Sequence, residues 1–175
     1  EQGPIKIGTA FIDRGRCLPW AMDRPCIVCQ ENCPVSPKAI FTRQVFNDIR
    51  ISQPLVVKSA DASRIEFQAD VLMAQQFATG DYYCAVPGRS NLQRRQIVAH
   101  TNHSLTIDGK HPFDPPPAAE QRVSIQIRLQ QPHVDPALCI GCGVCEHECP
   151  VLGKRAIRIT AENESRSREH ALILS

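Results

Sequence analysis

The sequence predicts an α+β protein in which both ends of the chain build one core with pseudo-two-fold symmetry. A long all-β module is inserted between the two halves of this core. Two observations lead to this fold class: cysteine-rich segments of similar pattern lie near both ends, and the stretch between them alternates β-branched or aromatic runs with turn signals. The expected domains are residues 1–45 together with 128–175, and the insert 46–127.

Composition excludes several classes of protein. The chain has 175 residues and 42% hydrophobic residues, enough to bury a core. A net charge of +2 and 5% aromatic residues argue against a nucleic-acid partner. No apolar run reaches the roughly 18 residues that a transmembrane segment needs. We therefore expect a protein that is cytoplasmic or peripheral to a membrane complex. We do not expect it to bind nucleic acid.

Cysteine is the most informative residue type. Eight of the nine cysteines fall into two groups, and Cys84 stands alone. The groups are Cys17, Cys26, Cys29 and Cys33, and Cys139, Cys142, Cys145 and Cys149. Cysteines two residues apart cannot easily pair with each other, whereas a tight turn can direct several thiolates at one centre. Clustering of this kind indicates a metal site.

The C-terminal group identifies the kind of metal site. "CIGCGVCEHECPV" has the spacing C-x2-C-x2-C-x3-C-P, which is typical of bacterial iron–sulfur runs, and Gly141 and Gly143 permit the close turns. A zinc ribbon uses two C-x2-C pairs separated by a longer loop, so this spacing disfavours zinc. The region resembles the bacterial two-cluster ferredoxin family, whose members carry two [4Fe-4S] clusters in a small pseudo-symmetric fold.

This resemblance makes the N-terminal group a second copy of the motif. Asp13 and Asp135 each precede the first cysteine of their group by four positions, and "CPVSPKAI" matches "CPVLGKRAI" with one residue added. The only departure is the long interval between Cys17 and Cys26, filled by "LPWAMDRP", which we expect to be a loop. Alternatively, Cys17 is an ordinary buried thiol and the first site holds a three-iron cluster.

In two-cluster ferredoxins the fourth cysteine of each run binds the other cluster. The resemblance therefore implies two ligand sets: Cys17, Cys26, Cys29 and Cys149 for one [4Fe-4S] cluster, and Cys139, Cys142, Cys145 and Cys33 for the other. Pro34 and Pro150 would each begin a short helix, because proline suits the first helical position. In the long interval, Trp20 and Met22 would either cover Cys17 or contact a partner, and we favour covering.

The insert carries its own strand pattern. The expected strands are "PLVVK", "RIEFQ", "DYYCAV", "RQIVAHT" and "SLTID", with a hairpin tip at Asn102 and His103. The bracketing strands "RQVFNDIRI" and "RVSIQIRLQQ" would form an extended hairpin of the core. Alternation along its strand favours Cys84 as a buried small hydrophobe over a ligand or a redox thiol.

Two further features have open interpretations. Arg89, Arg94 and Arg95 form the densest basic run, which is either a solvated loop or a surface that steers an acidic redox partner. His147 either donates a hydrogen bond to a ligand sulfur or is solvated.

Two classes of function follow from these residues. The first is an electron-transfer protein or subunit that resembles the dicluster iron–sulfur subunits of bacterial respiratory oxidoreductases, with a protein redox partner in a larger complex. The second is an interaction or sensing protein whose clusters are structural and whose β insert is the working part. The sequence has no nucleotide fingerprint and no catalytic constellation, so we expect no enzyme activity on this chain.

Overall fold

The computed structural model describes residues 5–70, 72, 76–88 and 91–165. It is an α+β structure, mostly antiparallel sheet with few and short helices. The chain divides into two compact units: a terminal unit, Glu1–Val45 with Leu129–Ser175, and a barrel unit, Phe46–Arg128. In the described part of the chain no helix is both long and apolar enough to cross a membrane.

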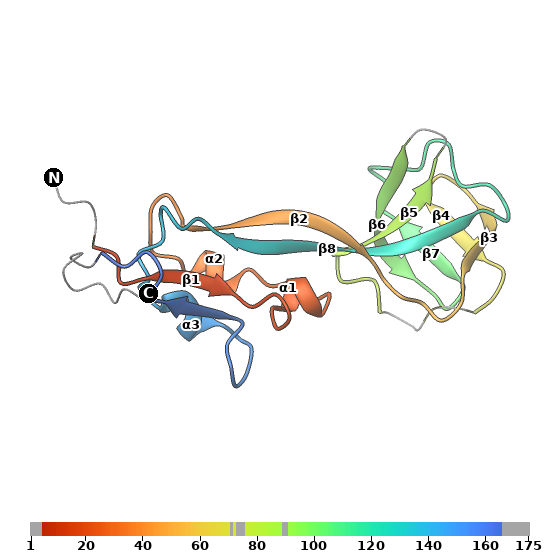
Figure 1. The fold of residues 1–175 in the computed structure, drawn as a ribbon. Helices are drawn as coiled ribbons and strands as arrows, with labels where there is room; N and C mark the ends of the chain where they lie inside the picture. Colours follow the sequence, from red (N-terminus) through yellow and green to blue (C-terminus); the bar gives the residue numbers. More distant parts are fainter. Residues whose placement is uncertain (1–4, 71, 73–75, 89–90, 166–175) are drawn as a thin grey trace. The chain divides into compact units, whose positions relative to one another are not determined.

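The terminal unit joins the two ends of the chain. Strand β1 (Thr9–Ile12) pairs antiparallel with β9 (Ile157–Thr160), and Figure 1 shows these two strands side by side. Strands β2 (Ile40–Asp48) and β8 (Arg122–Val134) are also neighbours in a sheet, as expected for the strands that bracket the insert. Each strand near the N-terminal cysteines therefore pairs with a strand near the C-terminal cysteines.

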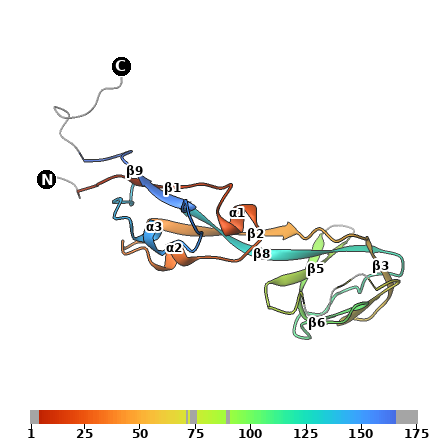
Figure 2. The same ribbon diagram turned by 90° about the horizontal axis from the view of Figure 1, so that it is seen from below.

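Three short helices lie in the terminal unit: α1 (Leu18–Ala21), α2 (Val28–Glu31) and α3 (Val144–Glu148). Helices α2 and α3 pack against one another (Figure 2). Helix α1 lies in the interval that we expected to be a loop, and Pro19 fits its first turn because proline needs no N–H donor there.

The helices expected to begin at Pro34 and Pro150 are absent from the described residues, so that expectation is wrong. Both α2 and α3 end before the Cys-Pro pair, and bends follow it. In the first copy Pro37 restricts Ser36 to extended backbone, which would stop a helix after its first residues. In the second copy Gly153 has a left-handed φ of 70°, which a helix does not allow.

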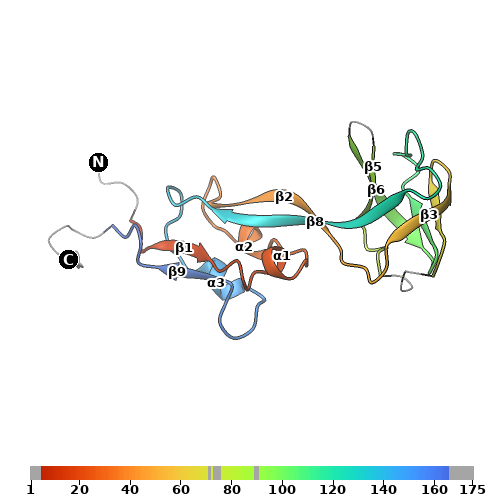
Figure 3. The same cartoon turned by 45° about the vertical axis from the view of Figure 1, so that its right-hand side comes forward.

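The barrel unit is built from strands, as the sequence predicts for the insert. They are β3 (Leu55–Ala60), β4 (Arg64–Phe67), β5 (Tyr82–Pro87), β6 (Leu92–His100) and β7 (Ser104–Ile107), together with part of β8. The pairing order β8-β3-β4-β7-β6-β5 returns to β8, so the sheet closes into a barrel (Figure 3). Closure leaves these strands without an open edge. The β6–β7 hairpin with its tip at Asn102 and His103 is confirmed.

The inside of the barrel is apolar. Its buried cluster includes Val57, Ile65, Leu105, Ile125 and Cys84. Cys84 is 0% exposed and no other cysteine belongs to this cluster, so its expected burial as a small hydrophobe is confirmed. The eight remaining cysteines all belong to the terminal unit.

Candidate metal centre

The eight cysteines of the terminal unit line two separate cavities. Cys17, Cys26, Cys29 and Cys149 line the first cavity, and Cys33, Cys139, Cys142 and Cys145 line the second. Each cavity thus takes three cysteines from one end of the chain and one from the other end. The other residues of both linings are apolar, for example Ile12 and Val151 in the first cavity, and Ile40 and Ile159 in the second.

In each run one aspartate holds the first cysteine, and the two runs do so in the same way. The Cys17 N–H donates to the carbonyl oxygen of Asp13 at 3.0 Å, and the Cys139 N–H donates to that of Asp135 at 3.0 Å. Each carboxylate also accepts a backbone N–H two residues ahead, from Gly15 at 3.1 Å and from Ala137 at 2.9 Å. Aspartate favours this turn because its side chain can bond its own backbone two residues on.

The two runs are also tied to each other reciprocally. The Asp13 N–H donates to the Ala156 carbonyl at 2.7 Å, and the Asp135 N–H donates to the Ala39 carbonyl at 2.7 Å. Ala39 and Ala156 each follow a Cys-Pro pair and are 1% and 3% exposed. The segment after each fourth cysteine therefore returns beside the other run's first cysteine, which brings Cys33 and Cys149 to the opposite cavity.

A cation also stands at the same aligned position of each copy, directly before Ala39 or Ala156, and bonds backbone carbonyls near the fourth cysteine, although not the equivalent ones. The sequence pattern did not lead us to single it out. The Lys38 Nζ donates to the carbonyls of Gln30 and Glu31, both at 2.7 Å. Arg155 Nη1 donates to the carbonyls of Cys149 at 2.6 Å and Val151 at 2.9 Å. The alignment of "CPVSPKAI" with "CPVLGKRAI" contained the signal, since it places Lys38 opposite Arg155.

Helices α2 and α3 bring two buried cysteines close together. Burial, and secondarily the neighbouring thiols of Cys17 and Cys26, raises the pKa of Cys29 to about 12. Burial, followed by the thiol of Cys29, raises the pKa of Cys145 to about 12. Burial likewise raises the pKa of Cys17 to about 11. Cys29 lines the first cavity and Cys145 the second, so the two cavities approach each other at this pair.

The second cavity is shaped by close backbone contact between its cysteine loop and the start of β1. Gly141 has φ of 72°, and a Cβ placed there would lie 2.5 Å from the Gly8 nitrogen. The Ala10 N–H donates to the Cys139 Sγ at 3.3 Å. Of the cysteines that line this cavity, Cys142 is exposed.

The long interval after Cys17 covers the first cavity on one side. Trp20 packs against the buried cysteine cluster, and its Nε1 donates at 3.2 Å to the carbonyl of Pro132, a residue of the cavity wall. Trp20 is in the covering position that we expected, whereas Met22 is 51% exposed. Cys17 itself is buried.

The other candidates from the sequence lie away from both cavities. The side chain of His147 is 86% exposed, and its Nδ1 lies 2.9 Å from the Glu148 Oε1, so it is solvated. Arg94 donates to Gln126 Oε1 at 2.6 Å and Arg95 to the Pro112 carbonyl at 2.7 Å. Arg89, the third residue of the basic run, lies outside the described residues.

The donor set of each cavity fits a four-iron cluster. A [4Fe-4S] cluster takes one thiolate for each iron, and each cavity offers four thiols within an apolar lining. Among the described residues, no group of three or more His, Cys, Asp or Glu side chains is arranged to hold a single metal ion.

Comparison with known proteins agrees with this chemistry for the C-terminal run. The family model described as the 4Fe-4S binding domain matches residues 132–152, which contain Cys139, Cys142, Cys145 and Cys149. Neither a curated protein nor a solved structure matches the chain significantly. The chain thus contains a 4Fe-4S binding domain, which supports an iron–sulfur protein with a role in electron transfer.

Proposed function

We propose that this chain relays electrons through two [4Fe-4S] clusters to or from a protein redox partner. The observation that carries the proposal is the partition of eight cysteines into two four-thiol cavities with exchanged fourth members. The 4Fe-4S family match covers the C-terminal run, and the similar surroundings of the N-terminal run support a second cluster there.

The proposed core is ferredoxin-like, with a pseudo-two-fold relation between its halves. Three paired observations support this relation. The Asp13 and Asp135 turns are alike, and the hydrogen bonds to Ala156 and Ala39 are reciprocal. Strand β1 precedes one aspartate and pairs with β9, while β8 precedes the other and pairs with β2.

When bound, a [4Fe-4S] cluster supplies one-electron exchange. The protein's part is to hold the ligands, exclude water and set the local polarity. Apolar side chains such as Ile12 and Ile159 line the cavities and keep water from the ligand sulfurs. The Ala10 N–H points to the Cys139 Sγ, and hydrogen bonds to ligand sulfurs tune the reduction potential. The neighbouring positions of Cys29 and Cys145 favour electron exchange between the two sites.

The remaining chemistry belongs to a partner in this proposal. Four thiols per cavity leave no open iron position for a substrate, so the chain itself is not expected to be an enzyme. We place the chain in a larger redox complex of the respiratory kind, in the cytoplasm or peripheral to a membrane.

A redox titration followed by electron paramagnetic resonance (EPR) tests the proposed relay. After anaerobic reconstitution, stepwise reduction should give two one-electron transitions that reverse fully on reoxidation without loss of iron. Cys84→Ala serves as a control variant, because it removes a thiol that lies in neither cavity. Clusters that cannot be reduced, or that break down after one reduction cycle, would contradict a relay and favour structural clusters.

A further inference from the structure

One surface of the terminal unit combines exposed cations with stacked aromatic rings. His133 stacks on Phe41 with ring centroids 5.4 Å apart, and it meets Trp20 edge-on, also at 5.4 Å. The Arg14 guanidinium lies 4.3 Å above the Trp20 ring, and that of Arg43 lies 5.7 Å from the Phe41 ring. We call these five residues the cation–aromatic surface.

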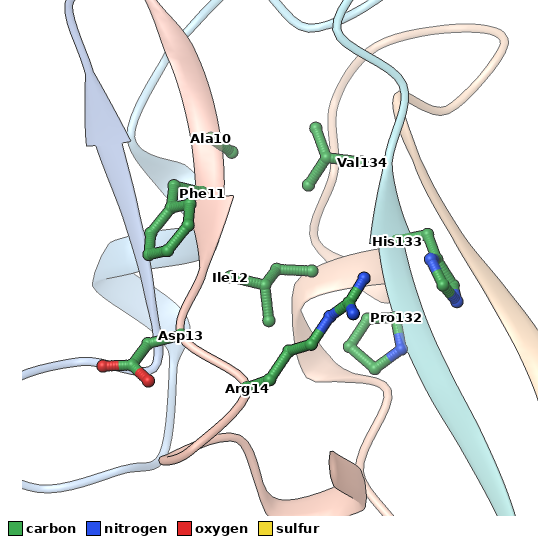
Figure 4. Close-up of a pocket in the computed structure, with 8 residues that line it drawn as sticks. All are labelled: Ala10, Phe11, Ile12, Asp13, Arg14, Pro132, His133 and Val134. Carbon is green, nitrogen blue, oxygen red and sulfur yellow. The ribbon is translucent and has the colours of Figure 1, made fainter.

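The two arginines of this surface form no salt bridge with any carboxylate among the residues that the structure describes. None of the salt bridges between described residues includes Arg14 or Arg43, and both side chains are exposed. The nearest acid in sequence, Asp13, bonds the Gly15 N–H and points away from the Arg14 guanidinium (Figure 4). This surface therefore carries positive charge that no salt bridge within 5–45 or 129–165 neutralises.

A hollow beside this surface leads toward the first cysteine cavity. The hollow has a volume of about 420 Å³, and Arg14, Pro132 and His133 lie in its lining (Figure 4). Its lining shares Ile12 and Pro132 with the first cavity, so one layer of side chains separates the two spaces. An electron at the first cysteine cavity would therefore have a short path to the protein surface at this hollow.

The pKa of His133 responds to the positive charges of the same surface. Burial, and then the charges of Arg43 and Arg14, lowers the pKa of this imidazole below its usual value. No carboxylate is among the groups that shift it. A bound anion would lie beside the two guanidinium groups that lower this pKa.

We propose that the cation–aromatic surface docks an acidic patch of the redox partner and that electrons cross between the proteins there. The proposal rests on the proposed relay function. One electron leaves the chain and reduces a one-electron centre of the partner, or passes in the opposite direction. Unpaired exposed arginines match carboxylates of a protein surface, and complementary charge chiefly raises the rate of encounter. The basic run noted in the sequence is less suited to docking an acidic partner, because Arg94 and Arg95 donate hydrogen bonds to other groups of the barrel unit.

Charged electron acceptors test where electrons leave the chain. The reduced holoprotein is mixed with the anionic cobalt(III)–EDTA complex or with the cationic hexaamminecobalt(III) ion, each of which takes up one electron to give cobalt(II). We expect oxidation by the anionic complex to slow several-fold when salt is raised. Arg14→Gln combined with Arg43→Gln should slow it about tenfold at low salt, in line with the effect of steering charges.

The matched control is Arg122→Gln in combination with Arg50→Gln, which removes two exposed charges of the barrel unit. It should leave the anionic rate within about twofold of wild type, because neither charge belongs to the cation–aromatic surface. Equal rates for the Arg14/Arg43 variant and this control, with unchanged iron content in both, would overturn the proposed docking surface.

A binding measurement separates failure of the surface from failure of the relay. Trp20 is the only tryptophan in the chain, so its fluorescence reports directly on the cation–aromatic surface. A hexaglutamate peptide should change this fluorescence in wild type and in the control, and the change should disappear in the Arg14/Arg43 variant. Peptide binding without electron exchange to either complex would contradict the relay alone. Electron exchange without charge preference or peptide binding would contradict the surface alone.

Discussion

Gly141 and Gly143 provide a sharp test of how the second cysteine cavity is built. Both residues have left-handed backbone, with φ of 72° and 81°, and alanine in that conformation costs about 1–2 kcal/mol. Gly143→Ala adds no steric overlap to this backbone cost, because no atom lies within 4 Å of the added Cβ. Gly141→Ala would place its Cβ 2.5 Å, 2.7 Å and 2.8 Å from the N, O and C atoms of Gly8.

The extra cost of Gly141→Ala follows from what Gly8 is attached to. To relieve the overlap, the backbone at Gly8 must move, although two bonds flank it: the Ile7 N–H to the Ile140 carbonyl at 2.9 Å and the Ala10 N–H to the Cys139 Sγ at 3.3 Å. Losing both adds about 2 kcal/mol, at roughly 1 kcal/mol for each hydrogen bond. We therefore expect Gly141→Ala to destabilise the terminal unit by about 3–4 kcal/mol and Gly143→Ala by about 1–2 kcal/mol.

Iron analysis and thermal loss of the cluster absorbance measure the difference. A destabilisation of 1 kcal/mol lowers Tm by about 2–4 °C for a chain of this size. Gly143→Ala should keep its iron with a Tm lower by a few degrees. Gly141→Ala should lose iron from the second site and melt about 10 °C lower. If both variants keep the full iron content and melt together, the Gly8–Gly141 contact does not hold this cavity in shape.

Three other substitutions test separate parts of the account. Cys17→Ser should remove iron from the first site and leave the second site filled, and an unchanged iron content would show that Cys17 is an ordinary buried thiol. Cys84→Ser should lower stability by about 1–3 kcal/mol, because it buries a hydroxyl in the apolar barrel core, but iron analysis should show no loss. Arg155→Met removes the hydrogen bonds to the Cys149 and Val151 carbonyls and should destabilise the terminal unit by about 3 kcal/mol in chemical unfolding. An unfolding midpoint equal to wild type would mean that Arg155 does not support the Cys-Pro segment.

Local spacing was enough to predict the grouping of the cysteines, because ligand loops are short and their turns follow from a few residues. The match of Asp13 with Asp135 was visible in the sequence, and both residues make the same turn in the structure. The strands of the insert were also visible, since their alternation and turn signals are local.

Features that depend on long-range contacts were not predictable in the same way. Barrel closure requires β8 to pair with both β3 and β5, and no local pattern specifies that pairing. The helices expected to begin at Pro34 and Pro150 are absent because Pro37 and Gly153, each three residues further on, do not continue a helix. The cation–aromatic surface was missed because Arg14 and Arg43 are distant in sequence, and their arrangement around His133 depends on the fold.

Iron and sulfide analysis combined with low-temperature EPR of the fully reduced protein tests the central claim most directly. Two [4Fe-4S] clusters with exchanged ligands should give about eight irons and about eight acid-labile sulfides for each chain. Because Cys29 and Cys145 bring the two sites together, the reduced spectrum should show magnetic coupling between the clusters. A content of about four irons with one uncoupled signal would contradict the account, since only the run from Cys139 to Cys149 would then hold a cluster.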